Sequence, residues 1–116
     1  MNKYGAKKTT LCGIKFDSQA EGRRYLQLLS DEQAGRISGL TTHPSFVVFD
    51  GRDAKGKAEV IKYLPDFTYT DEQGRKIAED VKGGRNGKGT VTRVYQMKAK
   101  MFRCRYHDIE LRIVEA

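Results

Sequence analysis

The chain has few residues of several types, and each shortage argues against a class of protein. It contains two cysteines, Cys12 and Cys104, which lie far apart and form no C-x-x-C motif. We therefore predict free thiols and a reducing, cytoplasmic location, with one long-range disulfide left open. Together with His43 and His107 the cysteines could supply four zinc ligands, but Cys12 and His43 do not have the spacing of a zinc knuckle. The pattern disfavours a structural zinc site.

Long apolar runs are missing as well. No stretch approaches the roughly 20 apolar residues that a membrane-spanning helix needs, and the first residues lack the hydrophobic region of a signal peptide. We therefore expect no membrane partner. A length of 116 residues suits one domain with a single core, spanning residues 1–116.

Acidic residues are absent from two long stretches of the chain. Residues 81–107 contain eight basic residues and no acid, and the N-terminal arm, residues 1–16, contains four lysines and no acid. The middle, from Asp17 to Asp80, has twelve acidic and nine basic residues. Basic ends around an acidic middle suit a polyanion such as DNA lying over a cation site. The candidate DNA-binding residues are Lys7, Lys8, Arg85, Lys88, Arg93, Lys98 and Lys100, with Gln96 as a further candidate.

Two helices are predicted from caps and periodicity. Ser18 is a candidate N-cap with Glu21 three residues later, which is a capping box, and the helix would turn Tyr25, Leu28 and Leu29 inward and end near Gly35. The second helix would begin at Thr90 or Thr92 and end near Tyr106. Its expected inward face consists of Val94, Met97, Met101 and either Cys104 or Arg105.

The remaining segments predict strands and loops. Residues 9–16 are expected to form a short strand or an extended arm, 45–49 a strand, and 50–58 a polar connection. Residues 61–70 alternate and predict one strand, 75–82 its hairpin partner, and 109–114 a closing strand. Residues 83–89, with four glycines, form a loop that lacks the G-K-[ST] ending of a P-loop.

The predicted hairpin brings two carboxylates together. If Gly74 takes the left-handed position of the turn, Thr70 pairs with Lys76, and Asp66 then lies opposite Asp80. Like charges in that relation are destabilising unless a cation lies between them. Lys82 lies on the same face as Asp80 because strand side chains alternate. A loop one residue longer would place Glu79 opposite Asp66 instead, which is disfavoured because Glu79 would face away from Lys82.

D-x-K alone is a weak motif, but the order of motifs along the chain is more specific. "YLPDF" followed by "AEDVKG", with "GIKFDSQAEGRRY" before and "YQMKAKMFRCRYHDIELRIV" after, resembles the PD-(D/E)xK nucleases, in particular their small phage-encoded endonucleases. The resemblance extends from about Tyr4 to Val114. It implies an α/β fold with a restriction-endonuclease-like core, ordered helix, three strands, helix and strand, around a mixed central sheet of four to five strands.

The resemblance also implies roles for individual residues. Asp66, Asp80 and the Val81 carbonyl would bind Mg²⁺, which Mn²⁺ can replace, with Glu21 on the first helix as a further acidic residue and Lys82 as the catalytic lysine. Glu21 has a second interpretation from its position, as part of the capping box alone. Asp80 stands where many relatives have Glu. His43 and His107 are left out as general bases, because metal-bound water needs no histidine.

The expected function is therefore that of a metal-dependent endodeoxyribonuclease, which hydrolyses phosphodiester bonds in phage DNA replication, recombination or packaging, branched DNA included. Its setting would be the cytoplasm of a bacterial host. We expect a homodimer at least on DNA, because paired cuts need two sites. The alternatives left open are a non-catalytic DNA-binding accessory protein that keeps the nuclease fold, and a subunit that depends on a partner protein.

Overall fold

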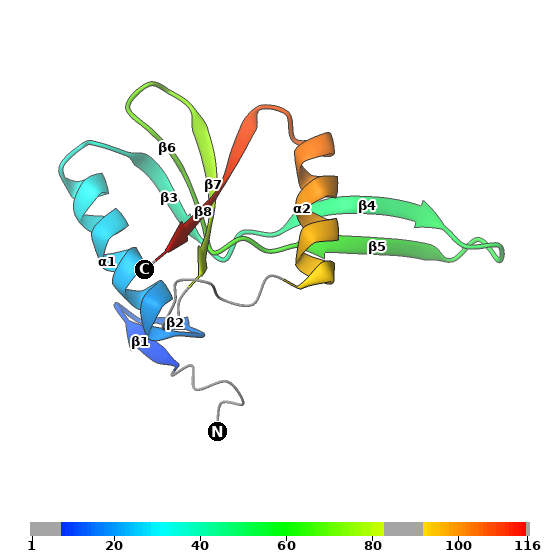
Figure 1. Cartoon of the computed structure of the whole chain (residues 1–116), viewed down its shortest axis with the longest axis horizontal. Helices are drawn as coiled ribbons and strands as arrows, with labels where there is room; N and C mark the ends of the chain where they lie inside the picture. The colour runs from blue at the N-terminus through cyan, green and yellow to red at the C-terminus, as the bar shows by residue number, and fades with distance from the viewer. Residues whose placement is uncertain (1–7, 83–91, 116) are drawn as a thin grey trace.

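A computed structural model describes residues 8–82 and 92–115 (Figure 1). These residues form helices α1 (Gln19–Gln33) and α2 (Arg93–Arg105). The strands are β1 (Thr9–Leu11), β2 (Ile14–Phe16), β3 (Ser38–Thr42), β4 (Phe46–Arg52), β5 (Ala58–Tyr63), β6 (Phe67–Thr70), β7 (Lys76–Lys82) and β8 (Ile109–Glu115). Neither of the two described helices is long and apolar enough to cross a membrane. Cys12 and Cys104 are both exposed, free thiols, as predicted.

The central sheet has the strand order β3, β6, β7 and β8. β6 is antiparallel to β3 and β7, whereas β8 is parallel to β7. A parallel neighbour needs a crossover connection, and α2 lies in the crossover between β7 and β8. The predicted mixed α/β class is confirmed. If the two hairpins β1–β2 and β4–β5 are set aside, the elements follow the order helix, three strands, helix and strand.

The two helices cover opposite faces of this sheet, as Figure 1 shows. Ile77 and Val81 of β7 pack in the same cluster as Tyr25 and Leu28 of α1. Ala78 packs instead with Phe102 of α2. Because side chains alternate along a strand, residues 77 and 81 point to one face and residue 78 to the other. β7 is therefore buried from both sides, which gives rigid support to the side chains near its end.

The first helix forms as its cap predicts. The Ser18 Oγ accepts a hydrogen bond from the Glu21 backbone N–H at 3.1 Å, which satisfies one of the free donors of the first turn. Tyr25 and Leu28 are buried, and the chain leaves the helix through Gly35 at φ +81°. β1 and β2, in the segment predicted as a strand or an arm, form a short hairpin beside the helix.

The prediction of one strand over residues 61–70 is wrong. The strand is interrupted at Leu64, Pro65 and Asp66, so that the segment forms two strands: β5 pairs with β4, and β6 pairs within the central sheet. Pro65 has no N–H to donate, which suits a residue that ends one ladder before another begins. The prediction of a polar connection over residues 50–58 is also wrong in part, because β4 continues to Arg52 before the turn.

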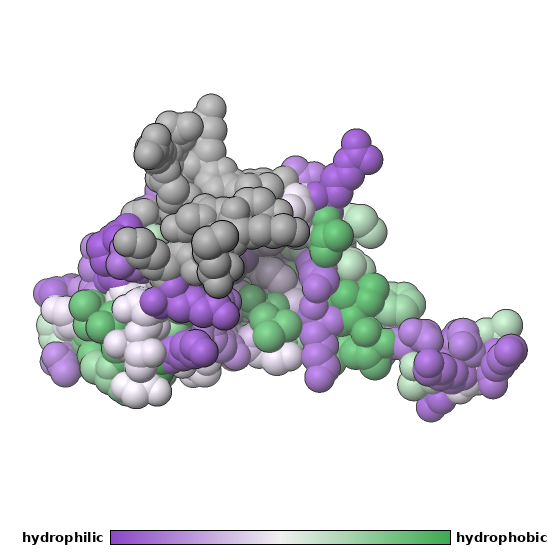
Figure 2. Space-filling view, turned by 90° about the horizontal axis from the view of Figure 1, so that it is seen from below, coloured by the Kyte–Doolittle hydropathy of each residue, from purple (hydrophilic) through white to green (hydrophobic). Residues whose placement is uncertain are grey.

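The β4–β5 hairpin, here named the β4–β5 arm, projects beyond α2 (Figure 1). Its base is held by Phe46, whose ring packs edge-on against Phe102 and Tyr106 at 5.1 Å from each. Residues 49–62 are exposed apart from Gly51, which is half-buried. In Figure 2 the outer end of the β4–β5 arm, on the right, is mostly hydrophilic, and hydrophobic residues gather where it meets α2. The β4–β5 arm is thus a surface feature with little support beyond its base.

The predicted inward face of the second helix is wrong in part: Met101 packs against the cluster that contains Phe102, but the other predicted residues are exposed. Thr92 caps α2 by accepting from the Tyr95 N–H at 3.0 Å, but Val94 and Met97 are 60% and 59% exposed. Ala99 and Phe102 are buried instead. Both sets of residues have helical spacing, so periodicity alone did not distinguish them. The aromatic rings at the base of the β4–β5 arm favour the face that carries Phe102.

Candidate active site

The carboxylates of the predicted hairpin lie where β6 and β7 meet the end of the central sheet. Thr70 pairs with Lys76 and Phe67 with Glu79, which confirms the predicted register of the hairpin; the ladder ends at Phe67, so Asp66 lies one residue before it and is not itself paired with Asp80. The Asp66 N–H donates to the Glu79 carbonyl at 2.9 Å. The Val81 N–H donates to Asp66 Oδ2 at 2.7 Å. The Asp66 carboxylate is therefore held against the backbone of β7 through Oδ2.

Glu21, in the first turn of α1, extends to the same end of the sheet. Burial, followed by the charges of Asp17 and Asp80, raises the pKa of its carboxyl group, and a hydrogen bond with Asp66 opposes that shift. Burial, together with the charges of Glu21 and Asp80, raises the pKa of Asp66 to about 7. The structure thus brings together three carboxyl groups from α1, the β5–β6 connection and β7.

Asp80 is more deeply buried, at 5% exposure. Burial raises the pKa of its carboxyl group, while a hydrogen bond from Tyr63 and the positive charge of Lys82 act in the opposite direction. Burial is thus the main reason that all three carboxyl groups hold their protons more tightly than in water, and the charges of neighbouring carboxylates add to it for Glu21 and Asp66. Oxygen-only groups of this kind are the ligands that hard divalent cations prefer.

Lys82 lies on the same side of β7 as Asp80. Its ammonium group is 4.2 Å from the centroid of the Tyr95 ring, a cation–π contact with the first turn of α2. Tyr63, at the end of β5, donates its phenolic hydrogen to Asp80 Oδ2. Neither tyrosine was predicted from the sequence. Pro65 was the sequence feature that could have predicted the position of Tyr63, because a proline interrupts a strand and allows Tyr63 and Phe67 to belong to different sheets.

Glu79 faces away from Lys82, towards α1. Its side chain is fully buried and accepts hydrogen bonds from Arg24 Nε and Nη2 at 2.6 and 2.9 Å. The Tyr69 hydroxyl donates to the same carboxylate. This geometry describes a satisfied buried ion pair, which supports the fold and leaves no oxygen facing the Asp66 and Asp80 carboxylates.

His43 lies beside Glu21, although no sequence pattern pointed to it as part of the site. Its Nε2 is 4.0 Å from Glu21 Oε2, and its ring centroid is 5.6 Å from that of Phe16. Its backbone N–H donates to the Asp66 carbonyl at 2.9 Å, and its φ of +51° is unusual for a residue other than glycine. The turn between β3 and β4 therefore fixes His43 at the edge of the carboxylate group.

The candidate DNA-binding residues are only partly covered by the structure. Lys8, Arg93, Gln96 and Lys100 are exposed, and Lys98 is half-buried. Arg93, Lys98 and Lys100 lie on α2, the helix whose first turn contacts Lys82. Lys7, Arg85, Lys88 and the loop 83–89 lie outside the described residues.

The donor chemistry of Glu21, Asp66 and Asp80 fits Mg²⁺ or Mn²⁺. Within residues 8–82 and 92–115, however, no three Asp, Glu, His or Cys side chains are grouped so as to hold a metal ion. One Asp80 oxygen is engaged by Tyr63 and one Asp66 oxygen by Val81. Coordination by this set would therefore need a rotation of the Glu21 or Asp66 side chain towards Asp80.

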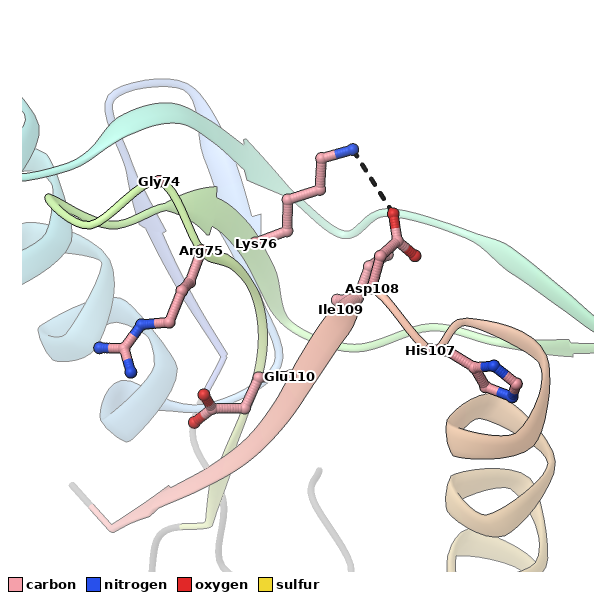
Figure 3. Close-up of a pocket in the computed structure, with 7 residues that line it drawn as sticks. All are labelled: Gly74, Arg75, Lys76, His107, Asp108, Ile109 and Glu110. Atoms are coloured by element: carbon pink, nitrogen blue, oxygen red, sulfur yellow. Dashed lines mark ion pairs between the residues drawn. The ribbon is translucent and has the colours of Figure 1, made fainter.

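A pocket of about 400 Å³ lies elsewhere, at the start of β7 and β8. Figure 3 shows Lys76 pointing towards Asp108, with 3.6 Å between Nζ and Oδ2, and His107 at the rim after α2. None of the three carboxylates lines it. His107 is therefore separated from the candidate site by the length of β7.

The chain belongs to the family described as protein of unknown function (DUF1064), whose model matches residues 1–116. No curated protein and no solved structure matches the chain. The family description assigns no activity.

Proposed function

We propose that the protein is a Mg²⁺-dependent endodeoxyribonuclease with the restriction-endonuclease-like core of the PD-(D/E)xK nucleases. The observation that carries the proposal is the meeting of Glu21, Asp66 and Asp80 beside Lys82: burial raises the pKa of all three carboxyl groups, and the charge of Asp80 raises those of Glu21 and Asp66 further. An ion pair or a capping role would account for one carboxylate. Three carboxylates that meet from separate elements indicate a site for a cation, because a bound cation relieves the repulsion between their negative charges.

Asp66, Asp80 and the Val81 carbonyl would hold the cation, with Glu21 binding directly or through water. The bound cation supplies Lewis-acid polarisation of the scissile phosphate and a lowered pKa for water. Lys82 carries a positive charge held by the Tyr95 ring, so its ammonium is placed to orient the attacking water or to stabilise charge on the phosphate. Mn²⁺ is expected to replace Mg²⁺, because both accept oxygen ligands.

DNA would lie across the N-terminal half of α2, over the site. Arg93 and Lys100 are exposed on that helix and available to phosphates, and Lys98, on a different face of the helix, is half-buried. Arg85, Lys88, Lys7 and Lys8 would extend the same basic surface. The biological setting proposed is phage DNA replication, recombination or packaging, with branched DNA among the substrates.

A homodimer on DNA would supply two sites in matching orientation. The β4–β5 arm is the surface that suits a second copy, since Phe49, Val60 and Ile61 are 44%, 50% and 37% exposed. Among the described strands, β4 and β5 pair only with each other, so each keeps a free edge that another strand can join. Sedimentation of Val60→Lys and wild-type protein, free and on DNA, tests this; a wild-type monomer in both states contradicts it.

The function itself is tested by Asp80→Asn. Asparagine keeps an oxygen that can accept from Tyr63 and loses the charge that the cation needs. Labelled linear, flapped and four-way DNA are incubated with Mg²⁺, Mn²⁺ or chelator. We expect wild-type cleavage only with metal, none from Asp80→Asn, and retained DNA binding in both. Asp108→Asn, at the distant pocket, is the matched control and should cleave normally.

Two results would contradict the proposal. Cleavage by Asp80→Asn at the wild-type rate would remove Asp80 from the site. Salt-sensitive DNA binding by wild-type protein with no cleavage under any metal condition would favour the non-catalytic accessory protein instead.

A further inference from the structure

Tyr63 and Tyr95 contact two residues of the candidate site, Asp80 and Lys82, and neither tyrosine is part of the catalytic motif. Tyr63 belongs to β5, in the separate two-stranded sheet, and Asp80 belongs to β7, in the central sheet. Both residues are buried, at 4% and 5% exposure. The hydrogen bond from the Tyr63 phenol to Asp80 Oδ2 therefore crosses between two sheets. It leaves Oδ1 as the Asp80 oxygen that Tyr63 does not use.

Tyr95 contacts both the Tyr63 ring and the Lys82 ammonium group. The Tyr63 and Tyr95 rings meet edge to face, with centroids 6.1 Å apart and planes at 64°. The Lys82 ammonium lies 4.2 Å from the Tyr95 centroid. The Tyr95 hydroxyl is buried and makes no hydrogen bond of ordinary geometry within the described residues, although it lies close enough to Asp80 and Tyr63 to affect the pKa of both. The ring of Tyr95, rather than its hydroxyl, thus makes the contact that concerns Lys82.

We infer that Tyr63 and Tyr95 are positioning residues, which fix the rotamers of Asp80 and Lys82 so that one carboxylate oxygen and one ammonium group face the reacting phosphate. The inference rests on the proposed function. Groups that hydrogen-bond a metal-ligating residue orient it, and their removal costs about 10- to 100-fold in metal affinity. Tyr63 would act in this way on Asp80, and Tyr95 would restrict Lys82 by cation–π attraction.

The simpler interpretation is that both tyrosines only fill the core. Tyr63 also packs against Phe102, with centroids 5.4 Å apart, so its ring has a packing role in either case. Tyr63→Phe keeps the ring and removes the hydroxyl, which separates the two interpretations. A matched control exists in Tyr69→Phe, which removes the same kind of bond, from a buried phenol to the carboxylate of Glu79, on the opposite face of the strand.

The first experiment measures Mn²⁺ binding by calorimetry on full-length protein without DNA. We expect Tyr63→Phe to raise the Kd by about 10- to 100-fold and Tyr69→Phe to leave it unchanged. Equal affinity in Tyr63→Phe and wild type would overturn the role of Tyr63, and so would an equal loss in both phenylalanine variants. Failure of the wild type to bind Mn²⁺ would overturn the proposed function, and this inference with it.

The second experiment concerns Tyr95 and does not require Tyr63→Phe to fold. Tyr95→Leu removes the ring, whereas Tyr95→Phe keeps it. We expect the leucine variant to lower kcat for Mg²⁺-dependent cleavage, with unchanged KM for DNA and unchanged Mn²⁺ affinity, and the phenylalanine variant to restore kcat. A normal kcat in the leucine variant, or an equal loss in both variants, would overturn the role of Tyr95.

Discussion

Asp66→Asn removes the charge of this carboxylate while keeping an oxygen that can accept the hydrogen bond from the Val81 N–H. In the wild type, burial and the charges of Glu21 and Asp80 raise the pKa of Asp66 to about 7 from an ordinary value of 3.8. The folded protein therefore holds this proton more tightly than the unfolded chain does. Stability is then greatest at low pH and falls as the pH rises through the folded pKa.

The size of the effect follows from these two pKa values. A folded pKa of about 7 and an unfolded value of 3.8 make metal-free protein about 2.5 kcal/mol less stable at pH 8 than at pH 5. Glu21 and Asp80 act in the same direction, because burial raises the pKa of both. Lys82 acts against it, as its charge lowers the pKa of Asp66. We expect a change of about 1–3 kcal/mol for wild-type protein.

Urea unfolding in chelator at both pH values measures this change. Because the unfolded carboxyl, with a pKa of 3.8, is already ionised at pH 5, Asp66→Asn should be more stable than wild type at both pH values, and its advantage should be about 1–3 kcal/mol larger at pH 8 than at pH 5. Asp108→Asn, an exposed carboxylate in the distant pocket, should show no such gain.

Addition of Mg²⁺ provides the second half of the test. A ligand that binds only the folded state stabilises it according to its concentration relative to Kd. Mg²⁺ should therefore raise wild-type stability at pH 8 and leave Asp66→Asn almost unchanged. If Asp66→Asn were less stable than wild type at pH 8 in chelator, the buried negative charge of Asp66 would not be destabilising, and the proposed cation site would lose its electrostatic basis.

Three further predictions concern other parts of the molecule. Arg24→Met leaves the buried Glu79 charge without its ion pair and should cost about 3–5 kcal/mol in urea unfolding; the double variant Arg24→Met, Glu79→Leu should recover much of it, and no recovery would contradict the pairing. Glu21→Gln retains the backbone N–H bond to Ser18, so it should abolish most Mg²⁺-dependent cleavage without lowering Tm, whereas full activity would give Glu21 a capping role alone. Arg93→Ala with Lys100→Ala should reduce the log–log salt dependence of DNA binding by about one unit for each phosphate that the protein no longer neutralises; an unchanged slope would place DNA on another surface.

Local features of the sequence were sufficient to predict the caps, the first helix, the central hairpin and its register. Ser18 caps α1 by accepting a hydrogen bond from the backbone N–H of Glu21, three residues later. Gly74, at φ +81°, lies in the turn that pairs Thr70 with Lys76. Such features depend on a few consecutive residues, so alternation and turn chemistry encode them directly. The same register brings Asp66, one residue before the ladder, close enough to Asp80 for the two charges to interact.

Only the tertiary structure decided which side chains surround those carboxylates. Val94 with Met97 and Ala99 with Phe102 have equally helical spacing, and the buried face became clear only when α2 was seen against Phe46 and the other rings at the base of the β4–β5 arm. Tyr63, Tyr95, His43 and Arg24 likewise reach their partners across separate elements. Periodicity describes one element at a time, whereas these interactions depend on how two elements pack. The sequence alone thus determined the carboxylate pair, and the packing of β5, α1 and α2 determined its environment.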